Sequence, residues 1–104
     1  MSTRTKTAYE HLEFPDADEM QVKARLVSAI SEQIKRRRLV QTEAAALLGF
    51  SQPKLSNLLR GQFRGVSERK LMNCLTKLGQ DIEIVVKPAP RSRREGRISI
   101  ELPR

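Results

Sequence analysis

The chain has very few of the residues that build disulfides, metal centres and catalytic sites. Its 104 residues include one cysteine, one histidine and no tryptophan, and aromatic residues make up 4% of the total. The lone Cys74 excludes an intrachain disulfide and fits a reducing compartment. Since no second cysteine or histidine stands near it, we expect Cys74 to pack as a small hydrophobe and expect no metal site.

Groups that could carry catalysis are equally scarce. His11 lies in a polar N-terminal stretch, and we interpret it as a surface residue. The sequence has no glycine-rich phosphate loop, no paired metal ligands and no nucleophile set beside a base. Apolar residues make up 38% of the chain, which suffices for a small helical core but not for a deep enzyme cleft. We therefore predict a binding protein that is not an enzyme and uses no cofactor.

Long apolar runs are also missing. No apolar N-terminal stretch resembles a signal peptide, and no run of about 18 apolar residues could span a bilayer. We therefore expect a cytoplasmic protein without a membrane partner. With so few aromatics, leucine, isoleucine, valine and alanine must fill the core.

Positive charge is what the chain has in excess. The formal net charge is +8, from 20 lysines and arginines against 12 acidic residues. Such a balance favours a polyanionic partner, because each cation that neutralises a nucleic-acid phosphate releases a counterion. The alternative is a soluble basic protein with no nucleic-acid role, which charge alone does not exclude.

The rest of the chain is organised around residues 41–61, QTEAAALLGFSQPKLSNLLRG. Residues 42–48 are rich in strong helix formers, and Gly49 accepts the left-handed backbone conformation that ends helices. Ser51 is placed to cap a second helix, where Pro53 costs little because first-turn amides have no intrahelical partner. This order predicts a helix, a tight turn and a second helix.

The second of these helices has two unlike faces. Leu55, Leu58 and Leu59 recur at the three-to-four spacing of a buried stripe, and polar residues occupy the opposite face. Two short helices across a turn of about 3–4 residues, the second with a polar outer face, form the helix-turn-helix pattern. The small Ala45 would let the two helices approach closely near the turn.

Residues 44–61, AAALLGFSQPKLSNLLRG, resemble the helix-turn-helix core of the phage-repressor and Cro-like family, also called the Xre family. More narrowly, they resemble its HigA-like antitoxin branch. The resemblance implies a mainly α, lambda-repressor-like bundle of about four to five helices that binds operator DNA of palindromic form. It further implies a small RelE-like, mRNA-cleaving toxin as partner, and a complex that represses its own operon.

The residues before this unit predict an arm and a long helix. Residues 1–15 are expected to form a flexible N-terminal arm, in which Tyr9, Leu12 and Phe14 dock on the core or on a partner. Asp16 followed by Glu19 predicts a capping box, and the helix is expected over residues 17–38. Its final residues, 35–38, are cationic, which suits a solvated helix C-terminus, and contact with phosphate or with a partner is the alternative.

The residues after residue 61 complete the predicted DNA-binding domain, residues 16–80. Residues 62–66 should form a loop in which Phe63 plugs the core, and Ser67 should cap a helix over residues 68–78. Val40 stands where related folds often have a polar cap. The next helix could therefore begin two residues later, with Thr42 as its cap.

The last segment, residues 81–104, is predicted to be a β extension. Residues 81–87 are β-branched and residues 97–102 alternate polar with apolar, which indicates two strands or a hairpin. A two-stranded hairpin is marginal alone, so pairing with a second subunit is expected, making the chain a homodimer. A flexible tail is the alternative, more so for residues 97–104.

The predicted DNA-contacting residues fall into two groups. An amide side chain can bond adenine at N6 and N7 together, and a lysine can donate to guanine. By resemblance to phage repressors, positions on the second helix face the bases. The base-contacting candidates are Gln52, Pro53, Lys54, Ser56 and Asn57, with Pro53 offering only apolar contact. The phosphate-contacting candidates, which position without specifying, are Gln41, Ser51, Arg60 and Arg64. A plain solvated helix face is the alternative for each residue.

Three functions remain open at this point. The first is a dimeric transcriptional regulator acting as an antitoxin, and the second is a stand-alone phage-type repressor without a toxin. The third is a non-specific basic nucleic-acid-binding protein. The resemblance favours the first.

Overall fold

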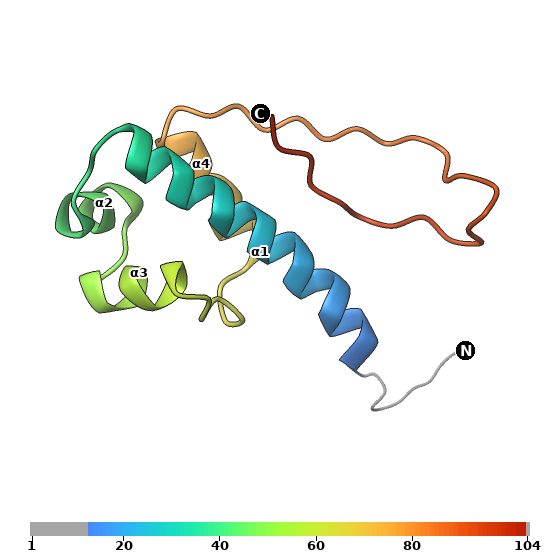
Figure 1. The fold of residues 1–104 in the computed structure, drawn as a ribbon, viewed down its shortest axis with the longest axis horizontal. Coiled ribbons are helices and arrows are strands. Elements are labelled where there is room, and N and C mark those ends of the chain that lie inside the picture. Colours follow the sequence, from blue (N-terminus) through green and yellow to red (C-terminus); the bar gives the residue numbers. More distant parts are fainter. Residues whose placement is uncertain (1–12, 104) are drawn as a thin grey trace.

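The structure is a computed structural model that describes residues 13–103, with side chains from residue 18 onward. The described chain forms four helices followed by an extended segment (Figure 1). The helices are α1 (Glu13–Arg36), α2 (Gln41–Leu48), α3 (Gln52–Leu59) and α4 (Glu68–Lys77). Most of the predicted arm, with Tyr9 and Leu12, lies outside the described residues.

Helix α1 is the support on which α4 and α3 pack. It contacts α4 most extensively and also α3, while α2 packs against α3 and α4. Its buried stripe consists of apolar residues at helical spacing: Val22, Leu26, Val27, Ile30 and Ile34. The helix begins at Glu13, so Asp16 lies inside it and cannot be the N-cap residue that the sequence predicted.

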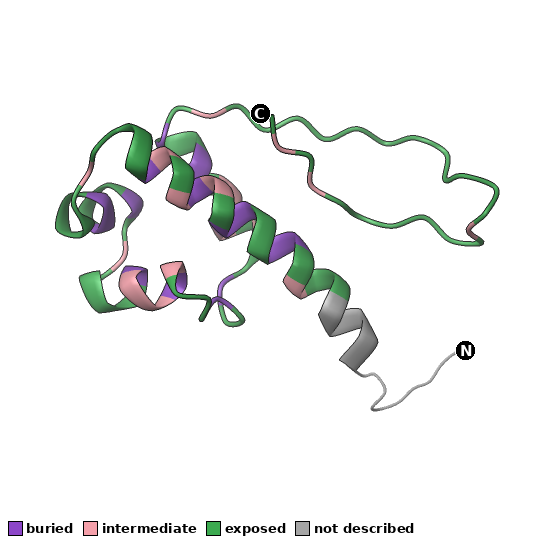
Figure 2. Ribbon diagram, in the orientation of Figure 1, coloured by how far each residue is buried: buried purple, intermediate pink, exposed green. Residues whose placement is uncertain are grey.

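The core is built almost entirely from aliphatic side chains. Leu48, Leu55, Leu71 and Leu78 are each fully buried, so every helix after α1 contributes leucine to one cluster. Phe63 is buried beneath the loop after α3, as predicted. Figure 2 shows that the buried residues gather where the four helices meet.

Cys74 belongs to this core. It is 1% exposed, and burial raises the pKa of its thiol, against the opposing effect of the nearby Lys70 and Lys77 ammonium groups. The raised pKa keeps the sulfur protonated at neutral pH. Cys74 therefore packs as a small hydrophobe, as the sequence predicted.

The start of α2 differs from one of the sequence predictions. Its N-cap is Val40, so the suggestion that Thr42 caps a helix beginning two residues later is wrong. Valine has no side-chain acceptor to offer the free amides. Instead, the Glu43 side chain accepts a hydrogen bond of 3.1 Å from the Val40 amide, which also places a negative charge at the helix N-terminus.

The predicted C-terminal β-strand or hairpin is wrong. Residues 81–103 contain no strand, and the backbone hydrogen bond found within them is a local one, from the Arg93 amide to the Pro90 carbonyl. β-Branched residues favour extended backbone, but a strand also requires a neighbour to pair its N–H and C=O groups. The segment leaves α4 and loops back (Figure 1), and Ile100 packs against the edge of the core.

Within the described residues, no helix is long and apolar enough to cross a membrane.

Helices α1 and α2 end in the same way, with one residue in the left-handed conformation. At the end of α2 this residue is Gly49, with φ of 80°, and the following amide of Phe50 bonds the Ala45 carbonyl. At the end of α1 it is Arg38, with φ of 56°, and the amide of Leu39 bonds the Ile34 carbonyl. A side chain in this conformation is strained where glycine is not.

We therefore predict that Arg38→Gly stabilises the protein by about 1 kcal/mol, because it removes the strain of a β-carbon in the left-handed region. Gly49→Ala, the reverse change at the matching position of α2, should destabilise it by a similar amount. Urea unfolding of both variants measures these changes. Destabilisation by Arg38→Gly would contradict the prediction and indicate that the Arg38 side chain makes a contact worth more than the strain.

Candidate nucleic-acid interface

The turn between α2 and α3 is fixed by local chemistry. Ser51 is the N-cap of α3, and its hydroxyl accepts a hydrogen bond of 3.3 Å from the Lys54 amide. Pro53 lies in the first turn, where its missing N–H is not needed. The predicted helix-turn-helix is therefore confirmed, residue by residue, from Gln41 to Leu59.

One side of α3 is committed to the core. Leu55 and Leu58 are 0% and 1% exposed, while Leu59 is half-buried at the edge of the stripe. An isolated helix of eight residues would be unstable in water, so this burial is what holds α3 together and fixes which side faces outward.

The five base-contacting candidates all lie on α3, but they differ in exposure. Gln52, Pro53 and Lys54 form an exposed first turn. Ser56 and Asn57, one turn further along, are half-buried. The first turn is therefore the most exposed part of α3, and the start of this helix is where helix-turn-helix proteins meet base edges.

The Arg60 side chain folds back along α3 to Ser56 and Asn57. The Arg60 guanidinium donates from Nη1 to the Ser56 hydroxyl at 3.3 Å and from Nη2 to Asn57 Oδ1 at 2.5 Å. Sequence reasoning placed Arg60 with the phosphates and the other two with the bases, and it missed this link. The sequence did carry a signal for it, because Ser56 and Asn57 precede Arg60 by four and three residues, the spacing at which side chains on a helix meet.

The bonds to Arg60 also orient the Asn57 side chain. Because Oδ1 accepts from the guanidinium, the Nδ2 hydrogens remain to donate outward, and Oδ1 keeps a second lone pair. The same arrangement places a positive charge beside the amide.

The four phosphate-contacting candidates surround α3 on the chain, and all four are exposed. Gln41 begins α2, where unpaired first-turn amides favour an anion. The Ser51 hydroxyl already accepts a bond from a backbone amide and still has its hydrogen to donate. Arg64 lies in the loop that follows α3.

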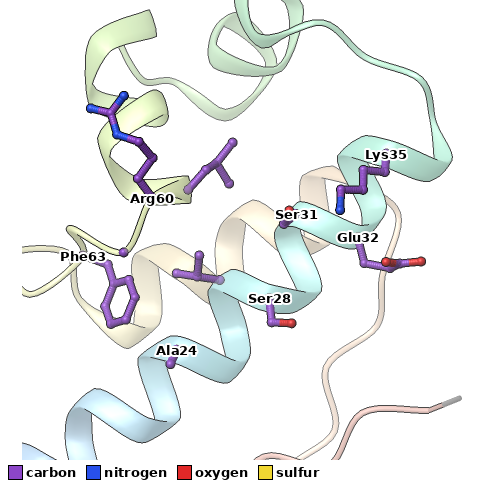
Figure 3. Close-up of a pocket in the computed structure, with 10 residues that line it drawn as sticks. Ala24, Ser28, Ser31, Glu32, Lys35, Arg60 and Phe63 are labelled. Carbon is purple, nitrogen blue, oxygen red and sulfur yellow. The ribbon is translucent and has the colours of Figure 1, made fainter.

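A shallow groove separates α1 from the end of α3 (Figure 3). Its volume is about 380 Å³, and its lining includes Ser28 and Ser31 of α1 and Phe63 of the loop. Figure 3 shows the Arg60 side chain directed away from the Phe63 end of the groove. The groove is open, and Leu59 and Arg60 line it at the end of α3. Among the described residues, no cluster of three or more His, Cys, Asp or Glu side chains could hold a metal ion.

A helix-turn-helix whose second helix buries leucines and exposes a polar first turn defines a class of DNA-binding proteins. Comparison with known families agrees: the model of a helix-turn-helix domain family matches residues 8–87, and the chain belongs to that family. One solved structure is named "Putative XRE Family Transcriptional Regulator". It shares 48% identity with this chain, with a TM-score of 0.77 over 85% of this chain and 99% of that one.

No curated protein matched the chain. The family and the solved relative together make this protein a DNA-binding transcriptional regulator of the Xre type, a class that generally has no enzymatic activity. The resemblance of residues 44–61 to the Xre family is confirmed for the family as a whole, not for its HigA-like branch.

Proposed function

We propose that the protein is a sequence-specific operator-binding repressor that acts as a homodimer and serves as the antitoxin of a type II toxin–antitoxin pair. The observation that carries the proposal is the exposed first turn of α3, flanked by exposed residues suited to phosphate. Family membership gives the DNA-binding class. The proposal adds which residues read the DNA, that two copies of the chain bind it together, and that the repressor is an antitoxin.

Base reading is assigned to the outward side of α3. In this proposal Gln52, Pro53 and Lys54 meet base edges first, and Ser56 and Asn57 follow one turn later. The phosphates on either side of the DNA major groove are then held by Gln41, Ser51, Arg60 and Arg64, which fixes the register of the protein on the DNA. The hydrogen bond from Arg60 to Asn57 supports this assignment, because the Arg60 cation at the end of α3 would draw a DNA phosphate close to the Asn57 side-chain amide.

Dimerisation is assigned to the segment 81–103. This segment carries most of the large hydrophobic side chains exposed on the described surface, among them Ile84 at 79%, Val86 at 93% and Ile98 at 79%. Apolar side chains gathered on one exposed segment indicate an interaction surface. A second copy is the proposed occupant, because two recognition helices about 34–36 Å apart would reach successive major grooves of a palindromic operator. The contact proposed is between side chains and does not require strands.

The antitoxin role rests on the resemblance of residues 44–61 to HigA-like proteins. By that resemblance the partner is a small RelE-like, mRNA-cleaving toxin, and the complex represses its own operon. A stand-alone phage-type repressor differs from this only in lacking the toxin. The non-specific alternative differs in lacking base preference, so DNA binding separates it from the other two.

For base reading, we predict that Gln52→Ala weakens binding to the DNA upstream of the protein's own gene by about 1–3 kcal/mol, because a base-edge contact is lost. Arg64→Ala should weaken cognate and scrambled DNA alike and lower the salt slope by roughly one unit. Fluorescence anisotropy at several salt concentrations measures both. Equal losses on cognate and scrambled DNA for Gln52→Ala would refute base reading by α3.

For dimerisation, we predict that Ile84→Lys combined with Val86→Lys converts the protein to monomers, because two desolvated contacts become charged. Light scattering should show the wild type at twice the 11.9 kDa of one chain. Leu47→Lys is the matched control, since Leu47 is an exposed hydrophobic residue of α2 outside the segment. A double variant that remains dimeric would place the interface elsewhere.

For the antitoxin role, we predict that co-expression with the neighbouring open reading frame yields a stable complex and restores growth of cells that the neighbour alone arrests. Pull-down and growth curves measure the two effects. No complex and no rescue would leave the stand-alone repressor as the function.

A further inference from the structure

A buried lysine joins α1 to the loop that follows α3. Lys23 is the one charged side chain that is buried among those described, with 3% of its surface exposed. Its ammonium donates to the Arg64 carbonyl oxygen at 2.8 Å and lies 3.2 Å from the Glu19 carboxylate. Burying an ammonium is costly unless oxygen acceptors surround it, so the two contacts account for its position. They tie the loop to α1.

A second lysine makes a similar contact on the other side of α3. The half-buried Lys70 of α4 directs its ammonium to the Leu48 carbonyl at 3.5 Å and lies 4.9 Å from the centre of the Phe50 ring. Helix α2 has no basic residue in its own last turn, so Lys70 supplies the positive charge that a helix C-terminus favours. A Cβ atom built on Gly49 would lie 3.7 Å from this ammonium, which places Lys70 directly over the turn.

The two lysines therefore hold the turn that precedes α3, at its first carbonyl, and the loop that follows α3. The leucine contacts decide which side of α3 faces the core, but hydrophobic attraction is non-directional and does not fix the exact position of the short helix along that core. Hydrogen bonds from an ammonium to a carbonyl are directional and add the missing constraint. Lys23 is buried, so it is not placed to contact a phosphate as an exposed lysine of a DNA-binding protein would.

We propose that Lys23 and Lys70 are positioning residues for DNA reading: they clamp the two ends of α3 so that its outward side chains keep one register against the bases. The proposal rests on the proposed base reading by α3. It predicts that removing either ammonium lowers discrimination between DNA sequences without removing a phosphate contact.

The test compares Lys23→Met and Lys70→Met with the wild type on upstream and scrambled DNA over a series of salt concentrations. Each variant should lose roughly fivefold to tenfold in the ratio of the two affinities, part of what base contacts supply. The salt slope should stay unchanged. Lys70→Arg should restore most of the ratio, because a guanidinium keeps donors for the carbonyl. Lys35→Met removes an exposed charge from α1 and should leave the ratio unchanged.

Two results would overturn the clamp. A slope lower by about 0.9 in either variant would show that the lysine contacts phosphate directly. An unchanged ratio in variants whose circular dichroism is that of the wild type would show that the contacts do not position α3. If Lys23→Met fails to fold, Lys70→Met, with its half-exposed side chain, decides. A wild type that does not discriminate overturns base reading itself, whereas a discriminating wild type with unaffected variants overturns the clamp alone.

Discussion

The burial of two leucines on one side of α3 is the constraint on which the rest of the structure depends. Leu55 and Leu58 are removed from water in the core, where α3 packs against α2 and α1. A helix of eight residues has too few internal hydrogen bonds to persist alone, so its existence and its orientation come from this packing. The same packing leaves the other side of α3 in solvent. The surface proposed to read DNA is therefore set by how a small aliphatic core is filled.

Much of the fold follows from local sequence signals with a direct physical cause. Gly49 ends α2, Ser51 caps α3 and Ser67 caps α4, each by satisfying or permitting backbone groups that the helix itself leaves free. The buried stripe of α1 likewise appears in its periodicity. These features were predictable because each depends on residues within a few positions of one another.

The features that could not be predicted depend on residues far apart in the sequence, or on which of several nearby side chains satisfies a backbone group. Residues 81–87 have the composition of a strand, but no partner pairs with them in the described chain, and pairing rather than composition makes a strand. Val40 serves as a cap because Glu43 substitutes for its missing acceptor. Lys23 bonds a carbonyl 41 residues away, which no periodicity reveals. In the candidate site, the sequence predicted which residues lie on α3 and beside it. It did not predict whether Arg60 extends into solvent or bonds Ser56 and Asn57, as it does in the structure.

The central claim is that α3, with its flanking residues, is the surface that meets DNA. Chemical-shift mapping of the backbone amides during titration with the upstream DNA tests it most directly, because it reports on every element at once. The account predicts the largest changes at Gln41, across residues 51–57 and across residues 60–64, with smaller changes in the basic stretch 87–97. Changes concentrated in residues 87–97, with α3 unaffected, would contradict it and show that charge on the C-terminal segment binds the DNA.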